Sequence, residues 1–304
     1  FQSFPSVKTL ETVTDDPKEL NPFSYVMEKH QRNYGGNGKI AKYMQAAYRY
    51  PENFSDFVYA SQLLQADGIR YGVEHYRRNR GRCMGAIYWQ LNDCWPVISW
   101  SSIDYYGRWK ALHYYAKRFF APVMLSCEEQ SWMTVEADMN RQHFEFEKSI
   151  RLNVTNETLD AHRVLVKWAV RKTDATILRE EEQWLEVPAL SAVWMDKVEL
   201  PQIDCFNEYV SYEAWENDQI ISQGTVIFSY PKYFHYLNPG LAVRVDGDEI
   251  VVKAEAYAKS VEIRNENDDL ILEDNYFDMN AGEYRVKILD GKPDGLKVRS
   301  GYDI

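Results

Sequence analysis

The chain has 304 residues, 45% of them hydrophobic and 27% charged, which is long enough for two or three globular domains. Its formal net charge of −11 argues against nucleic acid and anionic membrane surfaces as partners, because both call for a basic face. No apolar run approaches the length of a membrane span, and no segment reads as a signal peptide. A neutral ligand such as a sugar is compatible with this composition.

The number and spacing of the cysteines are a guide to the cellular compartment of the protein. The spacings match no zinc motif and are too sparse for a disulfide framework; the four cysteines are Cys83, Cys94, Cys127 and Cys205. Reduced thiols favour a cytoplasmic location. Two glycosylation-type triplets, which begin at Asn153 and Asn156, point weakly the other way.

The sequence offers no metal or cofactor motif. The six histidines share no metal-ligand spacing, and there is no Ser/His/Asp signature, phosphate-binding glycine loop or nucleotide fingerprint. We therefore expect no metal and no cofactor.

Helical periodicity predicts four helices in the first part of the chain. A helix over 23–31 follows Asn21-Pro22, because proline is favourable in a first turn, and a short helix over 39–49 ends before Pro51. The strongest helix is 54–80, with apolar residues on one face and arginines in its last turn. The fourth covers 108–120.

The stretch 83–104 carries the chemistry. Its apolar run Met84 to Tyr88 predicts a strand over 83–90, buried on both faces as in a parallel sheet. A loop over 91–107 follows, and three tryptophans within twelve residues (Trp89, Trp95, Trp100) are mixed with amides and carboxylates. Aromatic faces stack on pyranose rings, and polar side chains bind their hydroxyls. On chemistry alone, an aromatic cluster that only packs is the more frequent arrangement.

After Pro122 the hydrophobic period changes from 3.6 to 2. Alternating runs around 150–154, 164–170, 209–215 and 220–229 predict a β-sandwich over 123–231. A second all-β unit is predicted over 232–304, where Asp246-Gly247-Asp248 marks a tight turn. Its further strands lie around 261–263, 270–272 and 284–288. The chain is thus α/β over 1–122 and all-β beyond.

Three stretches carry a family resemblance. The run from Gly85 to Pro96, with Ser-Trp-Ser-Ser-Ile-Asp at 99–104, resembles the last barrel strand of family 2 glycoside hydrolases of the β-mannosidase type. Residues 1–6 resemble the segment after the nucleophile strand, and 274–283 resemble the terminal immunoglobulin-like domain. The resemblance implies a C-terminal remnant of a (β/α)8 TIM barrel over 1–122, followed by two immunoglobulin-like β-sandwich domains over 123–231 and 232–304.

The same resemblance implies a retaining, exo-acting β-mannosidase that hydrolyses terminal non-reducing β-D-mannose residues. Both catalytic glutamates would lie before residue 1, so the chain alone is expected to hold no catalytic residue and to be inactive. Trp89 would lie under the mannose ring, and Asn92 and Asp93 would bind sugar or shape the loop. Trp95 would pack or lie on the aglycone side. The expected substrate-binding residues are therefore Trp89, Asn92, Asp93 and Trp95.

Alternatives stay open. A sister exo-glycosidase acting on β-galactosides, β-glucuronides or β-glucosaminides would share these motifs. A non-catalytic carbohydrate-binding or interaction module would need exposed coplanar aromatics among Trp132, Trp168, Trp184, Trp194 and Trp215. The pair Asp93 and Asp104 could itself act on a sugar, although both lie on one loop. The expected partner is a β-mannoside oligosaccharide, without nucleic acid or membrane, and a homodimer is also compatible.

Overall fold

The computed structural model describes residues 1–134 and 146–304. The chain forms two compact units. Unit 1 comprises Phe1–Tyr71, Ile87–Lys117 and Asn238–Ile304, and unit 2 comprises Gly72–Ala86 and Arg118–Leu237. The predicted domain limits after residues 122 and 231 stay predictions, because a compact unit can combine parts of several family domains.

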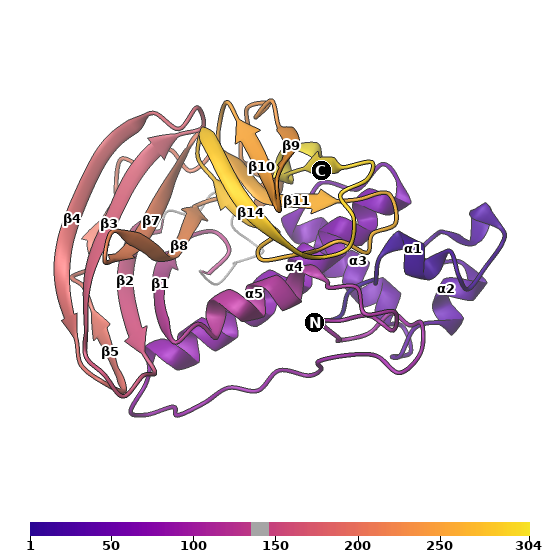
Figure 1. The fold of residues 1–304 in the computed structure, drawn as a ribbon, viewed down its shortest axis with the longest axis horizontal. Coiled ribbons are helices and arrows are strands. Elements are labelled where there is room, and N and C mark those ends of the chain that lie inside the picture. The colour runs from indigo at the N-terminus through magenta and orange to yellow at the C-terminus, as the bar shows by residue number, and fades with distance from the viewer. Residues whose placement is uncertain (135–145) are drawn as a thin grey trace. The chain divides into compact units, whose positions relative to one another are not determined.

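The four predicted helices are confirmed, with shifted ends. They are α2 (Tyr25–Lys29), α3 (Gly36–Ala47), α4 (Phe54–Arg78) and α5 (Ala111–Phe119), and α4 is the long helix in Figure 1. A short α1 (Val7–Leu10) and the 3-10 turn η1 (Pro17–Glu19) were not predicted. The Ser6 side chain caps α1 by accepting a hydrogen bond from Thr9 N, a local signal that is too short to form a helical period.

The predicted strand over 83–90 is wrong. These residues form no strand, and Met84, Ile87 and Trp89 are 68%, 100% and 72% exposed. A buried parallel strand requires partners on both edges. Within residues 1–134 and 146–304, no strand pairs with 83–89. The apolar run is therefore largely exposed and forms no strand with the described residues.

Unit 2 is a β-sandwich. One sheet has the order β1 (Val123–Gln130), β2 (Ser149–Asn156), β5 (Ser191–Trp194), with β6 (Val198–Glu199) also paired to β2. The other has the order β4 (Ile177–Val187), β3 (His162–Lys172), β7 (Glu208–Glu216), β8 (Gln219–Ile227), all antiparallel. Alternate side chains of both sheets, among them Val154, Val166 and Val210, fill one core. The short turn η2 (Pro231–Tyr233) follows β8.

Both glycosylation-type triplets lie in or next to β2, and their asparagines are buried. Asn153 and Asn156 each have 0% exposure. The Asn156 amide donates to the carbonyls of Asp160 and Pro188 at 2.8 and 2.9 Å. Neither asparagine is accessible in the folded chain, so the triplets no longer argue for glycosylation. All four cysteines are free thiols.

The strands of unit 1 form two small antiparallel sheets. The first has the order β12 (Ile271–Leu272), β14 (Gly282–Asp290), β10 (Glu249–Ala254), β9 (Ala242–Asp246). The second has the order β13 (Phe277–Met279), β11 (Ala258–Arg264), β15 (Lys297–Arg299), and the turn η3 (Gly301–Asp303) follows. The predicted tight turn is confirmed: Asp246 pairs with Glu249, and Gly247 between them has φ 67°.

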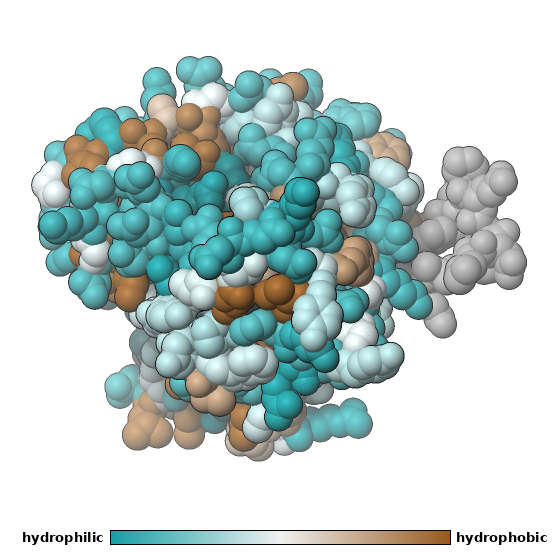
Figure 2. Space-filling view, turned by 90° about the vertical axis from the view of Figure 1, so that its right-hand side faces the viewer, coloured by the Kyte–Doolittle hydropathy of each residue, from teal (hydrophilic) through white to brown (hydrophobic). Residues whose placement is uncertain are grey.

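The face of the molecule drawn in Figure 2 is mainly hydrophilic. Figure 2 shows a face on which hydrophobic residues form small separate groups between hydrophilic ones. In the described parts of the chain, no helix combines the length and the apolar character that crossing a bilayer requires.

Candidate functional site

The loop after the exposed segment is closed by backbone hydrogen bonds. Gln90 N donates to Trp100 O at 3.1 Å, and Ser102 N donates to Gln90 O at 3.0 Å. The Trp89–Gln90 peptide bond is cis. Trp89 is 72% exposed, although the residue after it is tied to two others. The loop therefore presents an open indole face on a fixed backbone.

Asp93 organises the interior of this loop. Its carboxylate accepts hydrogen bonds from Ser99 Oγ at 2.7 Å and from Ser101 Oγ at 2.5 Å, one on each oxygen. Gln90 Nε2 lies 3.4 Å from Asp93 Oδ1. Asp93 is only 6% exposed. Its geometry therefore fits the loop-shaping role rather than direct contact with a sugar.

Asn92 and Trp95 lie at the outside of the loop. Asn92 is exposed, and its Nδ2 lies 3.4 Å from Asp93 O. The Trp95 ring packs beside His30 with centroids 5.2 Å apart, and His30 Nδ1 lies 2.6 Å from Pro96 O. Trp95 thus keeps part of its surface open while helping to hold the loop against residue 30. Of the predicted site residues, Trp89, Asn92 and Trp95 are accessible, and Asp93 is not.

Asp104 is a second buried anchor. It accepts hydrogen bonds from Tyr106 N and Arg108 N, each at 2.9 Å, and from the Thr9 hydroxyl. Asp104 is 2% exposed, so neither it nor Asp93 reaches solvent. Two buried carboxylates that are committed to their own loop cannot approach a glycosidic bond, which removes the Asp93–Asp104 pair as a catalytic candidate.

Lys110 is a buried cation beside these two carboxylates. It is 1% exposed, and its Nζ lies 3.4 Å from Ser3 O and 3.5 Å from Ser101 Oγ. Burial lowers the pKa of the Lys110 ammonium to about 8, against the opposing attraction of Asp93 and Asp104. The first residues of the chain and the loop therefore share one buried ionic cluster.

The segment 1–4 is bound to the loop and to α4. Ser3 N donates to Ser99 O at 3.0 Å, and Ser3 Oγ donates to Gln65 Oε1 at 2.6 Å. Gln65 Nε2 donates to Trp100 O at 3.0 Å. Sequence reasoning missed Lys110, Ser3 and Gln65 as parts of the site. The available signal was Gln65, an amide on the face of α4 that also carries Phe57, Val58 and Leu64.

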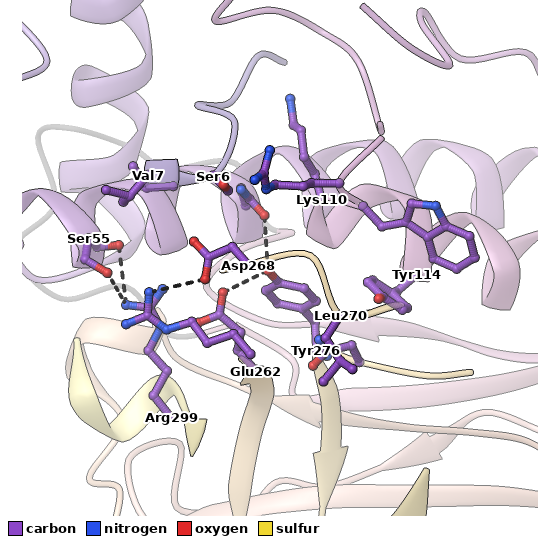
Figure 3. A pocket seen from close by; sticks show the side chains of 16 residues that line it. Ser6, Val7, Ser55, Lys110, Tyr114, Glu262, Asp268, Leu270, Tyr276 and Arg299 are labelled. Carbon is purple, nitrogen blue, oxygen red and sulfur yellow. Dashed lines mark hydrogen bonds and ion pairs between the residues drawn. The ribbon is translucent and has the colours of Figure 1, made fainter. Parts of the chain in front are cut away.

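Unit 1 also contains a small polar cavity of about 50 Å³ (Figure 3). The Arg299 guanidinium bonds to Glu262 and donates to Ser55 Oγ at 3.2 Å. Tyr276 donates to Glu262 at 2.8 Å. Ligand pockets for drug-sized molecules are roughly 300 Å³ or more, so this cavity is too small for a sugar ring. It is a structural ion network that joins β11 and β15 to α4.

Two family models match the β-rich part of the chain. The model described as mannosidase Ig/CBM-like domain matches residues 148–233, and the model described as Ig-fold domain matches residues 236–304. Both matches support the immunoglobulin-like character of these two parts.

Curated relatives and solved structures extend the likeness along the chain. β-Mannosidase B of Thermothelomyces thermophilus is 29% identical over 99% of this chain and 38% of its own length. β-Mannosidase of Capra hircus is 38% identical over 41% of this chain and 16% of its own length. The β-D-mannosidase of Dictyoglomus thermophilum has the same fold, with a TM-score of 0.83 at 24% identity over 99% of this chain and 36% of that chain.

An exo-chitosanase of Amycolatopsis orientalis has a related fold, with a TM-score of 0.66 at 16% identity over 98% of this chain and 41% of that chain. The chain thus spans little more than a third of the length of the relatives that match it throughout. The order of helical segment, sandwich and Ig-fold domain, together with these matches, identifies the chain as corresponding to the C-terminal part of a family 2 glycoside hydrolase of the β-mannosidase type.

Proposed function

We propose that the protein is an exo-acting β-mannosidase and that this chain supplies Trp89 as the platform under the mannose ring. The observation that carries the proposal is the open indole of Trp89 on a loop whose backbone is fixed at residues 90, 100 and 102. A flat aromatic face beside polar groups suits the C–H face of a pyranose. The names of the relatives that match 99% of the chain support a β-mannoside as the substrate.

Retention requires two carboxyl groups roughly 5–5.5 Å apart, one as nucleophile and one as acid/base. Asp93 and Asp104 are buried and hydrogen-bonded, so neither is the nucleophile or the acid/base in this proposal. The proposal takes both catalytic glutamates from outside these 304 residues, as the family resemblance implies. The indole face then stabilises the flattened, oxocarbenium-like ring more than the ground-state sugar. Such differential binding raises kcat/KM.

The test is the Trp89→Ala substitution in the full-length protein. We expect kcat/KM for an aryl β-mannoside to fall at least ~10-fold, as losing ~1.4 kcal/mol of transition-state stabilisation gives. The melting temperature should not change, because Trp89 is exposed. Trp184→Ala is the matched control, since Trp184 is also exposed, at 53%, but lies on β4.

A Trp89→Ala variant with the kcat/KM of the original protein would remove Trp89 from the site. Assay of aryl β-glucosaminides, β-galactosides and β-glucuronides beside the β-mannoside tests the sister activities. Preference for any of these over the β-mannoside would overturn the proposed substrate but would still support a glycosidase activity.

A binding module built on the sandwich is not favoured. On the sheet that contains β3, β4 and β7, Arg163 lies 4.5 Å from the Trp184 ring centroid, and Lys167 Nζ lies 5.3 Å from that of Trp215. Trp168 is in the core. A sugar would have to displace these cations to stack on the rings, so the geometry supports surface packing.

A further inference from the structure

The hydroxyl of Ser102 lies at the centre of a small hydrogen-bond network in unit 1. Ser102 Oγ lies 3.0 Å from Leu91 O, 2.9 Å from the Tyr88 hydroxyl and 3.2 Å from His113 Nδ1. Ser102 is 0% exposed, so the centre of the network is closed to bulk water. We call this arrangement the Ser102 clamp: the side chains of Tyr88, Ser102 and His113 with the Leu91 carbonyl.

The chemistry of the three partners fixes the direction of each hydrogen bond in the Ser102 clamp. A backbone carbonyl can only accept, so the one proton of the Ser102 hydroxyl goes to Leu91 O. Ser102 Oγ must then use its two lone pairs to accept from the Tyr88 hydroxyl and from His113 Nδ1. The Ser102 hydroxyl is thereby saturated, with one hydrogen bond donated and two accepted.

His113 is held in the tautomer that the Ser102 clamp requires. Burial lowers the pKa of the His113 imidazole, which favours the neutral ring with a single N–H group. That N–H is on Nδ1, because Ser102 Oγ has no second proton to give. The Trp109 ring packs beside the imidazole, with centroids 4.5 Å apart. His113 belongs to α5, so the clamp anchors the loop to a helix.

The Ser102 clamp holds the chain on both sides of Trp89. Tyr88 precedes Trp89, and Leu91 lies two residues after it. Ser102 N donates to Gln90 O at 3.0 Å and lies 3.1 Å from Leu91 O, so the backbone and the side chain of Ser102 bind the same segment. Trp89 is 72% exposed, so packing against its own side chain does little to orient it. The direction of the indole therefore depends on how residues 88, 90 and 91 are held.

We propose that Ser102 and His113 are positioning residues of the β-mannosidase, which orient the Trp89 platform under the sugar without touching the sugar themselves. The inference rests on the proposed function and deepens it, because it assigns the orientation of the platform to the link between the loop and α5. Catalysis depends on the alignment of the bound ring, and small misplacements of a positioning group lower the rate.

The test is a double-mutant cycle in the full-length protein, with His113→Leu and Trp89→Ala made alone and together. Leucine fills part of the volume of the imidazole but donates no hydrogen bond. We expect His113→Leu to lower kcat/KM for an aryl β-mannoside at least ~10-fold when Trp89 is present, and less than ~2-fold when Trp89 is already replaced by alanine. The penalty disappears in the second background because His113 acts through Trp89.

Two further variants separate the hydrogen bond from the shape of the side chain. His113→Asn is the rescue variant, because an asparagine amide can place an N–H group where histidine has Nδ1–H. We expect its kcat/KM to lie within ~3-fold of that of the original protein. Ser102→Ala removes the shared oxygen and should behave like His113→Leu. The control is His75→Leu, at an exposed position on α4, which should behave like the original protein.

Equal penalties of His113→Leu with and without Trp89 would overturn the inference and leave the proposed function standing, since a general loss of structure lowers kcat/KM in both backgrounds. An unchanged kcat/KM in His113→Leu would do the same. If His113→Leu loses its cooperative melting, Tyr88→Phe replaces it in the cycle, because it removes only one hydroxyl of the clamp. An unchanged kcat/KM in Trp89→Ala, or an original protein that is inactive on every aryl β-mannoside, would overturn the proposed function, and the inference with it.

Discussion

Lys110 shows what a single buried charge costs this fold. Its ammonium is enclosed beside Asp93 and Asp104, and desolvation outweighs their attraction, so its pKa falls from 10.5 to about 8. Between pH 8 and 10.5 the unfolded chain therefore binds the proton that the folded chain has released, and the free energy of unfolding rises with pH. Below about pH 8, the buried charge costs about 3 kcal/mol, at 1.36 kcal/mol per pKa unit.

We therefore predict that Lys110→Met is more stable than the original protein at pH 7, by up to about 3 kcal/mol. The difference should shrink as pH rises toward 10.5, where the lysine is neutral in both states. Urea denaturation at several pH values measures it. Lys39→Met, at an exposed position on α3, should stay within about 0.5 kcal/mol at every pH. Destabilisation by Lys110→Met at pH 7 would mean that the ionic cluster is net stabilising.

At the scale of an element, the first turn of α3 needs a residue without a side chain at position 36. A Cβ on Gly36 would lie 2.6 Å from Gln31 Cδ and 2.7 Å from Gln2 Oε1. A Cβ on Gly38, two residues along the same helix, would have no atom within 4 Å. Glycine at residue 36 thus leaves space for the side chains of Gln2 and Gln31, which are hydrogen-bonded to each other, whereas glycine at residue 38 only weakens the helix.

The two glycines should consequently respond to alanine with opposite signs. Gly36→Ala displaces the hydrogen-bonded side chains of Gln2 and Gln31 and should destabilise the protein by about 1–3 kcal/mol, less the gain in helix propensity. Gly38→Ala should stabilise it by up to about 1 kcal/mol. Melting temperatures of both variants, measured side by side, decide the matter. A shift of the same sign in both would show that Gly36 is not needed for close approach.

Sequence patterns predicted the elements that carry their own periodicity. Along the sequence, apolar residues recur with the helical period in α4 and at every second position in β2, β3 and β7. Strand β4 was missed because its first eight residues are all exposed, so its Arg-Glu-Glu-Glu run has no apolar period. Residues 83–90 show the reverse: an apolar run predicts burial, but pairing partners decide whether a strand forms.

The candidate site was predictable to the same extent. Composition alone marked Trp89 and its loop, because aromatic and amide residues cluster in the sequence. The bond from Gln2 to Gln31 joins residues 29 positions apart, and the one from Ser3 to Gln65 spans 62. Such pairings between single polar side chains leave no periodic trace. They become visible only when the fold brings the segments together.

At the scale of the whole molecule, the Arg299 network links β15 to β11 and α4 within unit 1. Arg299 bonds to Glu262, to Asp56 Oδ1 at 3.1 Å and to Ser55 Oγ at 3.2 Å, and its guanidinium lies 4.3 Å from the Tyr59 ring centroid. The side chains of Arg299 and Glu262 are 13% and 9% exposed. Removing one partner of such a buried pair leaves the other charge without compensation.

Arg299→Met should therefore destabilise the protein by about 3–5 kcal/mol. Arg285→Met removes an arginine that also contacts two carboxylates, those of Asp246 and Glu249, but its side chain is 48% exposed, so its loss should cost much less than the loss of Arg299. Guanidinium denaturation of both variants measures how much free energy of unfolding each one loses. Similar losses in the two would show that burial adds nothing to the Arg299 network.

The composition of unit 1 has a consequence for biosynthesis. Arg299 and Ser55 are separated by 244 positions, and the segment 118–237 of unit 2 lies between them. The ribosome therefore synthesises α4 first, then the whole sandwich, and only afterwards β15, whose Arg299 bonds to Ser55 in the first turn of α4. The sandwich can close its core while the nascent chain is still growing, whereas the helices of unit 1 must wait with their polar contacts unmade. Translation order thus makes β15 complete the contacts of α4 only after the sandwich has been synthesised.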